Sequence, residues 1–341
     1  MSSEKAYFAF QAVKGIQANK EYYTAMVPLA MIPKLFVFTD EELNPEARAQ
    51  RTLNKGRIPE MCNYILKNPD SYVFSSLTVS VDSDLTFIPV SEDSPALGTL
   101  QIPMDAKCLI NDGQHRKAAI EAALKKNPKL KYEHISVVFH HDLGLKKSQQ
   151  MFSDLNRYAI RPTKSLNILY DDRDALSRLV RRMVWELPIF DGLVETEKTT
   201  ISNRSRKLFT LSAIYHGTKA LLKDLEGNHE EYAVAFWNEI YEATEEWKAV
   251  AERHMKAADV RRDYLCSLGV TITALGMAGN KLIKQCPQNW KEKLRVLKDV
   301  DWNKKSEKWN GLVVVNEKVV SSKTTEADLA HYFEQLFLDR G

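Results

Sequence analysis

The stretch 106-AKCLINDGQHRKAAIEAALKKNP-128 decides the architecture of the first part of the chain. Its opening residues, 106–111, predict a short strand, and a tight turn follows at Asp112 and Gly113. From Gly113 the apolar residues recur at helical spacing as far as Asn127, which predicts a helix. Because Gly113 permits a positive φ and a close approach of the backbone to a ligand, this strand–turn–helix unit predicts a small anion cradle.

The cradle offers hydrogen-bond donors that suit a phosphate group. The first amide groups of a helix lack intrahelical partners and lie at the positive end of its dipole. Arg116 lies within this first turn, where its guanidinium can hold two phosphate oxygens, and Gln114 and His115 add further donors. Turns of this kind are common, so chemistry alone leaves open an ordinary turn with a structural or solvated His115 and Arg116.

Strand-like and helical segments alternate around this unit through the first 160 residues. The strands are recognised by β-branched and aromatic runs, and the helices by apolar residues that share one face. We expect strands within 24–38, 72–81, 85–90, 106–111 and 135–141, and helices over 57–68, 113–127 and 146–158.

Helical periodicity dominates from Lys164 onward. We expect helices over 174–187, 205–225, 231–254, 291–300 and 325–339, the last capped by Thr324 or Thr325. One exception is 311–323, where two β-branched runs predict a hairpin. Within the helices, Trp237, Tyr241 and Trp247 recur at helical spacing, which predicts core positions.

The change from strands to helices places a domain boundary near 161-RPTKS-165. We therefore expect an N-terminal domain over 1–163, with a mixed sheet and helices, and a mainly helical domain over 164–341. The fold class is α+β.

Composition supports a folded protein with two domains. The chain has 341 residues, 44% of them hydrophobic, and a formal net charge of only +3. It contains no run of 18 apolar residues and no basic region followed by an apolar run at its start, so we expect a cytoplasmic protein. The cysteines form no C-x-x-C pair, and we expect buried, reduced thiols at Cys62, Cys108, Cys266 and Cys286.

Three segments carry a resemblance to a known family. The pentapeptide 112-DGQHR-116, the segment 152-FSDLNRYAIRPTKS-165 and the tract 198-KTTISNRSRKLFTLSAIYHG-217 resemble the DGQHR-domain family, which includes the DndB proteins of DNA sulfur modification. The same strand–turn–helix position carries G-E-R-R in ParB partition proteins and G-C-H-R in sulfiredoxins. The resemblance therefore implies that the N-terminal domain is ParB/sulfiredoxin-like and holds nucleotide phosphates at this turn.

The segment 152–165 resembles the ParB segment E-N-x-x-R, which supplies a metal ligand and a phosphate contact. In this alignment Asp154 takes the place of the Asn and Ser153 that of the Glu. The resemblance implies Asp154 as a Mg²⁺ ligand, with ATP or another NTP as the cofactor. The residues implied to hold the nucleotide are Asp112, Gly113, Gln114, His115, Arg116, Asn156 and Arg157.

The resemblance implies a DNA-binding transcriptional repressor of a DNA phosphorothioation operon. Its expected partners are the double-stranded DNA of its own promoter, the phosphorothioation machinery and other copies of the chain. The alternatives are a ParB-like NTPase or a metal-dependent enzyme that nicks DNA, with Asp112 and Asp154 as candidate catalytic residues, and a nucleotide-gated clamp. Ser153 in place of Glu argues against efficient hydrolysis, and Gln114 in place of a cysteine argues against sulfiredoxin chemistry.

Two basic tracts are candidates for contacts with DNA phosphates. In 198–209 basic residues occur without an acid, and Ser202 or Ser205 is expected to cap a helix. In 173–183 three arginines are expected on roughly one helical face. The candidate DNA contacts are Lys198, Arg204, Arg206 and Lys207 in the first tract and Arg178, Arg181 and Arg182 in the second. A third basic tract, 304–323, contains the expected hairpin, and for each tract a solvated face remains the alternative.

Overall fold

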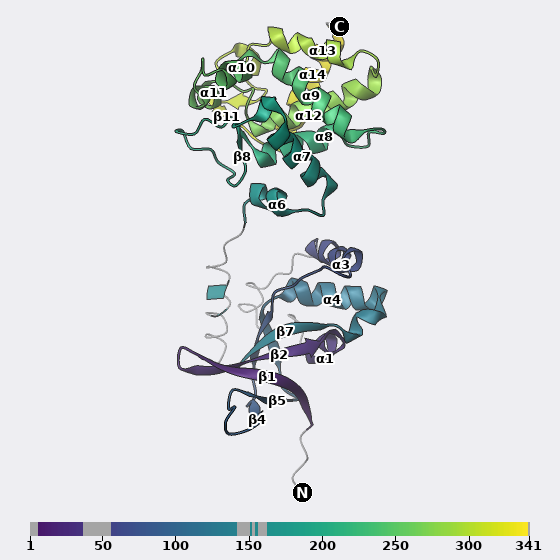
Figure 1. The fold of residues 1–341 in the computed structure, drawn as a ribbon, viewed down its shortest axis with the longest axis vertical. Coiled ribbons are helices and arrows are strands. Elements are labelled where there is room, and N and C mark those ends of the chain that lie inside the picture. Colours follow the sequence, from purple (N-terminus) through teal and green to yellow (C-terminus); the bar gives the residue numbers. More distant parts are fainter. Residues whose placement is uncertain (1–5, 37–55, 142–150, 152–153, 156–161, 340–341) are drawn as a thin grey trace. The chain divides into compact units, whose positions relative to one another are not determined.

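The computed structural model describes residues 6–36, 56–141, 151, 154–155 and 162–339. The chain divides into two compact units, Met1–Ile160 and Arg161–Gly341, and each has its own hydrophobic core. The expected α+β class is confirmed, since a sheet with helices occupies the first unit and helices dominate the second (Figure 1).

The first unit is built on a mixed sheet of seven strands in the order β4-β5-β1-β2-β7-β3-β6. The strands are β1 (Tyr7–Gln17), β2 (Lys20–Pro28), β3 (Leu77–Val81), β4 (Thr86–Pro89), β5 (Leu97–Pro103), β6 (Cys108–Asp112) and β7 (His134–His141). Neighbouring strands are antiparallel except β3 and β7, which run parallel. The DGQHR segment therefore begins at the end of the edge strand β6 and leaves the sheet there.

Helices cover one face of this sheet. They are α1 (Ile32–Leu35), α3 (Arg57–Lys67) and α4 (Gln114–Lys126), with 3₁₀ turns at Leu29–Met31 and Pro128–Tyr132 (Figure 1). Alternate strand residues such as Val79, Val137 and Phe139 point into the core, where they pack with Ile65 of α3 and Ile120 of α4. This period-two burial fixes the register of the strands that position the turn at Gly113.

The structure corrects the elements expected near the N-terminus. Strand β1 was not expected, although Phe10 and Ala12 alternate with exposed residues and are buried. The second half of the strand region expected within 24–38 is instead a 3₁₀ turn and α1, in which Pro33 lies in the first turn. Strand β3 is shorter than the expected 72–81, because 72–76 is irregular.

The second unit consists mainly of helices around the central α12 (Gly269–Gln285). The others are α6 (Lys164–Tyr170), α7 (Ala175–Glu186), α8 (Leu211–Leu221), α9 (His229–Ala243), α10 (Glu245–Ala251), α11 (Ala257–Asp263), α13 (Trp290–Leu294) and α14 (Lys323–Asp339). Two short strand pairs accompany them: β8 (Val194–Glu195) with β9 (Phe209–Thr210), and β10 (Val314–Val315) with β11 (Lys318–Val319).

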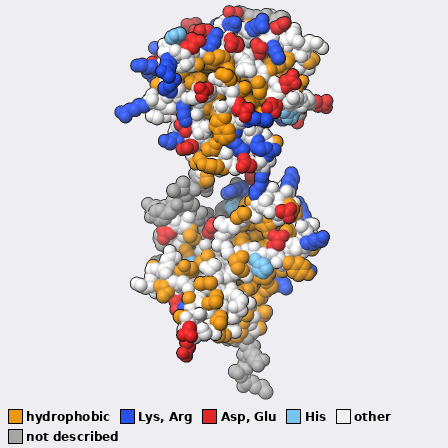
Figure 2. All heavy atoms as spheres, viewed as in Figure 1, with side chains coloured by type: hydrophobic (Ala, Val, Ile, Leu, Met, Phe, Trp, Pro, Cys, Tyr) orange, Lys and Arg blue, Asp and Glu red, His pale blue; other side chains and the backbone are white. Residues whose placement is uncertain are grey.

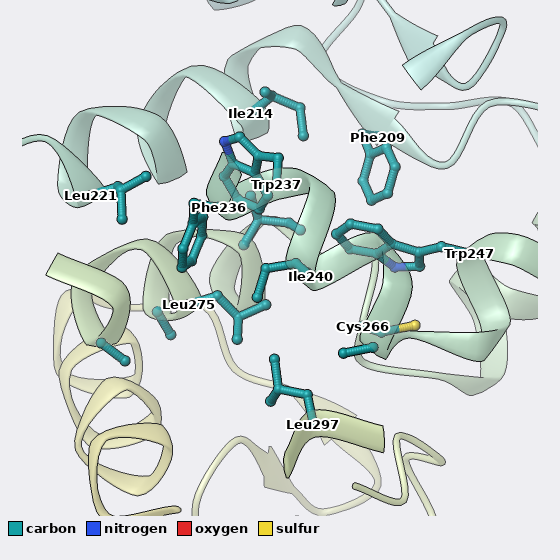
Figure 3. Packing of buried hydrophobic residues seen from close by; sticks show 14 of the residues in the cluster. Phe209, Ile214, Leu221, Phe236, Trp237, Ile240, Trp247, Cys266, Leu275 and Leu297 are labelled. Atoms are coloured by element: carbon teal, nitrogen blue, oxygen red, sulfur yellow. The ribbon is translucent and has the colours of Figure 1, made fainter. Parts of the chain in front are cut away.

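Aromatic and aliphatic side chains fill the core of this unit (Figure 3). Trp237 and Trp247 are buried there, as expected, and Phe209 stacks edge-on against Trp247 with ring centroids 4.6 Å apart. Helices α8 and α12 touch backbone to backbone, because a Cβ on Gly276 would lie 2.1 Å from the carbonyl oxygen of Gly217. The two glycines thus permit an approach that any side chain would block.

Several expected boundaries in the second unit are wrong. The helix expected over 205–225 begins only at Leu211, and the one expected over 231–254 breaks at Thr244, whose hydroxyl donates to the carbonyl of Ile240. The last helix is capped by Ser322, whose Oγ accepts from the amide of Thr325, and not by a threonine. The cap was misplaced because two threonines, Thr324 and Thr325, come after Ser322 and Lys323 and suit the same position.

The expectations for the hairpin and for three of the four cysteines are confirmed. The hairpin within 311–323 exists, with positive φ at Asn316 and Glu317 in its turn. The four cysteines are free thiols, of which Cys62, Cys108 and Cys266 are buried. In the described part of the chain, no helix has the length and apolar character needed to cross a membrane.

Candidate functional site

The turn after β6 has the backbone that the sequence predicts. Gly113 precedes α4 with φ +106, a left-handed conformation that other residues rarely adopt. A Cβ at this position would lie 2.4 Å from Cδ2 of Leu77 on β3. Glycine is therefore required both by the conformation and by the close packing of the turn on the sheet.

Arg116 folds back over this turn. Its guanidinium donates to Oδ2 of Asp112 at 2.5 Å, to the carbonyl of Ser75 at 3.1 Å and to the Ser75 hydroxyl. The Arg116 side chain is 12% exposed, whereas the Asp112 side chain is 45% exposed. The structure thus brings Asp112, Gly113 and Arg116 together, with the guanidinium held by a carboxylate that a phosphate would have to replace.

Gln114 and His115 serve the turn in different ways. The Gln114 amide donates to the carbonyl of Ile110 at 2.9 Å and so ties the helix start to the strand. Burial, and then the positive charge of Arg57 on α3, lower the pKa of His115. The imidazole is therefore neutral at pH 7, and its donor capacity toward an anion is that of a single N–H.

Asn111 belongs to this site, although it was not among the predicted site residues. It is completely buried, and its amide donates to the Ser80 hydroxyl at 2.6 Å and to the sulfur of Met151 at 3.3 Å. It links the strand of the DGQHR motif to β3 and to the chain beyond β7. The available signal was a single amide at the end of the apolar run that precedes Asp112.

Asp154 lines a cavity of about 810 Å³ in the first unit. Thr78 and Ser80 of β3, His140 of β7 and Lys20 of β2 also line it, and the His140 ring stacks on Tyr22 with centroids 5.6 Å apart. Burial lowers the pKa of His140, which keeps this imidazole neutral at pH 7.

The two motifs meet only indirectly in the described part of the chain. The residues that line the cavity of Asp154 include neither Asp112 nor Arg116, although Thr78 pairs with Asp112 across the sheet. Asn156 and Arg157 lie outside the described residues. Among the residues that are described, no group of three or more His, Cys, Asp or Glu side chains is placed to hold a metal ion.

The first basic tract forms an irregular loop between β8 and β9 in the second unit. Lys198, Arg204 and Arg206 are exposed, and the Lys207 ammonium lies 3.4 Å from a carboxylate oxygen of Glu195. Figure 2 shows Lys and Arg side chains gathered at the edge of this unit where Figure 1 labels α11. The loop therefore presents three exposed cations.

The serines of this loop do not cap a helix, contrary to expectation. Ser202 Oγ accepts from the amide of Arg204 at 3.3 Å, and Ser205 Oγ accepts from the amide of Lys207 at 3.2 Å. Both are serine turns within the loop, and the next helix, α8, is capped by Thr210.

The second basic tract is corrected at Arg181. This side chain is 7% exposed and donates to the carbonyls of Ile168 and Asp171, each at 2.9 Å, and to the Asp172 carboxylate. It therefore fixes the end of α6 to α7, and its donors are not available to DNA, because Arg181 is one of the buried residues of α7.

The exposed face of α7 carries Arg178, Arg182 and Trp185. Arg178 donates to the carbonyl of Arg173 at 3.1 Å, and Arg182 pairs with Glu230 at 3.0 Å. Trp185 follows at helical spacing and is 63% exposed, which is unusual for so large an apolar side chain. Trp185 is not among the predicted site residues, because its helical spacing equally suits a core position.

In the third basic tract the first lysine has a structural role. Lys304 donates to the carbonyls of Arg261 and Arg262 at 2.9 and 2.7 Å, at the end of α11. Burial lowers the pKa of Lys304. The hairpin itself exposes Val315 and Lys318.

Comparison with known proteins gives one result that spans both units. A family model described as DndB, DNA-sulfur modification-associated, matches residues 10–337. Searches of curated proteins and of solved structures found no match.

Proposed function

Because the chain belongs to the DndB family of DNA-sulfur modification-associated proteins, we propose that it is a repressor that binds the promoter of a DNA phosphorothioation operon. The observation that carries the proposal is the loop between β8 and β9, with Lys198, Arg204 and Arg206 exposed. The tract 198–209 contains no acidic residue. Cations without competing carboxylates are what a DNA backbone requires for affinity.

The exposed face of α7 is a second candidate surface for DNA. Arg178 and Arg182 provide charge, and Trp185 provides an apolar plane at the end of the same face. Arginines read guanines and phosphates, and aromatic planes contact bases or sugars. This face supports the proposal less strongly than the loop, because Arg182 is paired with Glu230.

We further propose that the DGQHR turn binds a nucleotide phosphate and that binding alters DNA affinity. A phosphate at the start of α4 would take over Arg116 from Asp112, to which the guanidinium now donates. ATP or another NTP with Mg²⁺ is the proposed ligand. Asp154 would contribute a carboxylate oxygen to the ion, which suits the preference of Mg²⁺ for oxygen ligands.

The proposed partners are the double-stranded promoter DNA, the phosphorothioation machinery and a second copy of the chain. Many operators contain two half-sites, which a symmetric dimer contacts together. Light scattering with and without promoter DNA measures the number of chains in each particle. A monomer in the absence of DNA and one chain per operator in its presence would contradict the dimer.

The decisive experiment is fluorescence-anisotropy binding to promoter DNA and to a scrambled duplex at ~150 mM salt, with and without ATP and Mg²⁺. We expect tighter binding to the promoter than to the scrambled duplex. Arg204→Ala/Arg206→Ala should weaken binding to both duplexes, with a salt slope lower by about 0.9 for each phosphate that the variant no longer binds. The exposed pair Arg295→Ala/Lys298→Ala removes equal charge elsewhere in the second unit and serves as the control. Equal affinity for both duplexes, together with DNA nicking or phosphate release, would contradict the repressor proposal and support an enzymatic function.

The nucleotide site has its own test, calorimetric titration with ATP and Mg²⁺. We expect Arg116→Ala to abolish binding, as should Arg157→Ala. Lys117→Ala is the matched control, since Lys117 is the next residue on α4 and its ammonium pairs with Glu121 at 2.9 Å. Unchanged affinity in both arginine variants would remove the site from the DGQHR turn.

A further inference from the structure

A single guanidinium fastens the basic loop to helix α11. Arg261 donates to the carbonyl of Ser202 at 2.8 Å, to that of Ser205 at 3.3 Å and to that of Lys207. These contacts join residues that are 54 to 59 positions apart in the sequence. The donors of one planar group thus bind three carbonyls of a six-residue segment, which is possible because guanidinium donors form a rigid fork.

The direction of these contacts determines which groups of the loop are exposed at its surface. Because the carbonyls of 202, 205 and 207 turn toward Arg261, they are removed from the surface that an anion would meet. Arg204 and Arg206, which alternate with the anchored positions, are exposed. Burial lowers the pKa of Arg261, but an arginine remains charged, so it adds positive potential beneath the loop.

Both ends of this attachment are themselves held. Within the loop, the amide of Ser205 donates to the carbonyl of Ser202 at 2.9 Å, and the two serine turns fix the amides of Arg204 and Lys207. Behind the loop, Lys304 binds the carbonyls of Arg261 and Arg262 and so holds the end of α11. The loop is therefore pre-organised by contacts that leave its cations exposed.

We infer that Arg261 is the positioning residue of a phosphate-binding loop, holding 202–207 in the conformation in which Arg204 and Arg206 meet the backbone of duplex DNA. This inference rests on the proposed function and adds to it a residue that touches no DNA. Fixing the loop in advance removes the conformational entropy that binding would otherwise cost. A positioning residue should change affinity without changing the number of phosphates that the protein binds.

The test compares Arg261→Gln with Arg262→Gln. Arg262 is the next residue on α11, is exposed and pairs with Asp259 and Asp263 at 2.9 and 2.6 Å, so its replacement removes the same charge without touching the loop. We expect Arg261→Gln to weaken promoter binding ~10-fold at an unchanged salt slope. Arg262→Gln should weaken it at most about two-fold, and Arg261→Lys should restore part of the affinity, since an ammonium reaches fewer carbonyls.

A second measurement works without DNA. Trypsin should cut after Arg204 and Arg206 faster in Arg261→Gln than in Arg262→Gln or the unaltered protein, because the anchored backbone resists cleavage. Ser202→Ala/Ser205→Ala changes no charge but removes both serine turns, so trypsin should also cleave the loop of this variant faster. Thermal unfolding of each variant separates this local effect from loss of the fold.

The outcomes separate the inference from the proposed function. If Arg204→Ala/Arg206→Ala weakens promoter binding while Arg261→Gln behaves like Arg262→Gln, the repressor stands and the positioning role is overturned. A salt slope lowered by about 0.9 in Arg261→Gln would show a direct phosphate contact and would also overturn positioning. If the unaltered protein shows no promoter preference, both the proposed function and the DNA role of Arg261 are overturned.

Discussion

Single residues decide the shape of the DGQHR turn. Gly113→Ala should lower the free energy of unfolding of the first unit by about 2–3 kcal/mol, since the left-handed φ and the overlap with Leu77 both oppose a side chain. Urea denaturation followed by circular dichroism measures this decrease.

Gly192→Ala provides the control for this variant. Gly192 also has a positive φ, +66, but a Cβ there would meet no atom within 4 Å. We expect a decrease of only about 1 kcal/mol, from conformation alone. Equal decreases at both glycines would show that packing on Leu77 contributes nothing.

At the residue scale, the sequence predicted the chemical role of a residue in a local turn better than the burial and long-range contacts of a side chain. The turn at Asp112 and Gly113 was predicted because its signal is local: two residues between a strand and a helix. The burial of Arg181 was not, since the carbonyls that bind its guanidinium lie in the preceding helix and bend. The contacts of Arg261 bridge more than fifty positions, which no local pattern indicates.

At the scale of an element, helix α7 depends on the residue that precedes it. Asp174 caps the helix, accepting from the amide and hydroxyl of Ser177 at 3.0 and 2.8 Å and from the Tyr215 hydroxyl at 2.8 Å. Burial alone would raise the pKa of Asp174, but these hydrogen bonds outweigh it and lower the pKa below its usual value.

This cap makes a prediction about pH. Because the folded pKa of Asp174 is depressed, its carboxylate stabilises the fold above the usual Asp value of 3.8, and the contribution disappears as pH falls through the folded pKa. Asp174→Ala should cost about 1–2 kcal/mol at pH 7. Asp174→Asn should cost less, since an amide oxygen still caps, and its deficit should shrink as the pH falls below 3.8. A deficit independent of pH in thermal unfolding would contradict this account.

The bounds of helices and strands were predicted most closely where the sequence pattern of apolar residues is clear. Helix α3 and the strands β4 and β7 were expected within a residue or two of their bounds, because runs of β-branched and aromatic residues mark the strands and apolar residues on one face mark the helix. Strand β1 was missed because its inward face includes the small residue Ala12, and its outward face carries the apolar Val13. The late start of α8 was missed because the basic loop before it contains no proline or glycine.

At the scale of the whole molecule, the two hydrophobic cores are separate. The buried cluster of the first unit lies within Phe10–Phe139, and that of the second within Ile168–Phe337. We expect residues 162–341, expressed alone, to unfold cooperatively and to retain promoter preference. Residues 1–160 should retain nucleotide binding only. Near-ultraviolet circular dichroism and anisotropy test both fragments, and a second fragment without a cooperative transition would contradict the independence of its core.

The contact between Gly217 and Gly276 has a mechanical consequence. Helix α8 follows the basic loop through β9. Its backbone contacts that of α12 directly, with no deformable side chain between them. A force applied to the loop, such as tension from a bound duplex, is therefore transmitted along α8 to α12 in the centre of the second unit. It is not dissipated by local deformation of the loop. The unit should resist stretching from this point as one stiff body, and single-molecule extension through a handle at Arg206 should record a single rupture rather than gradual yielding.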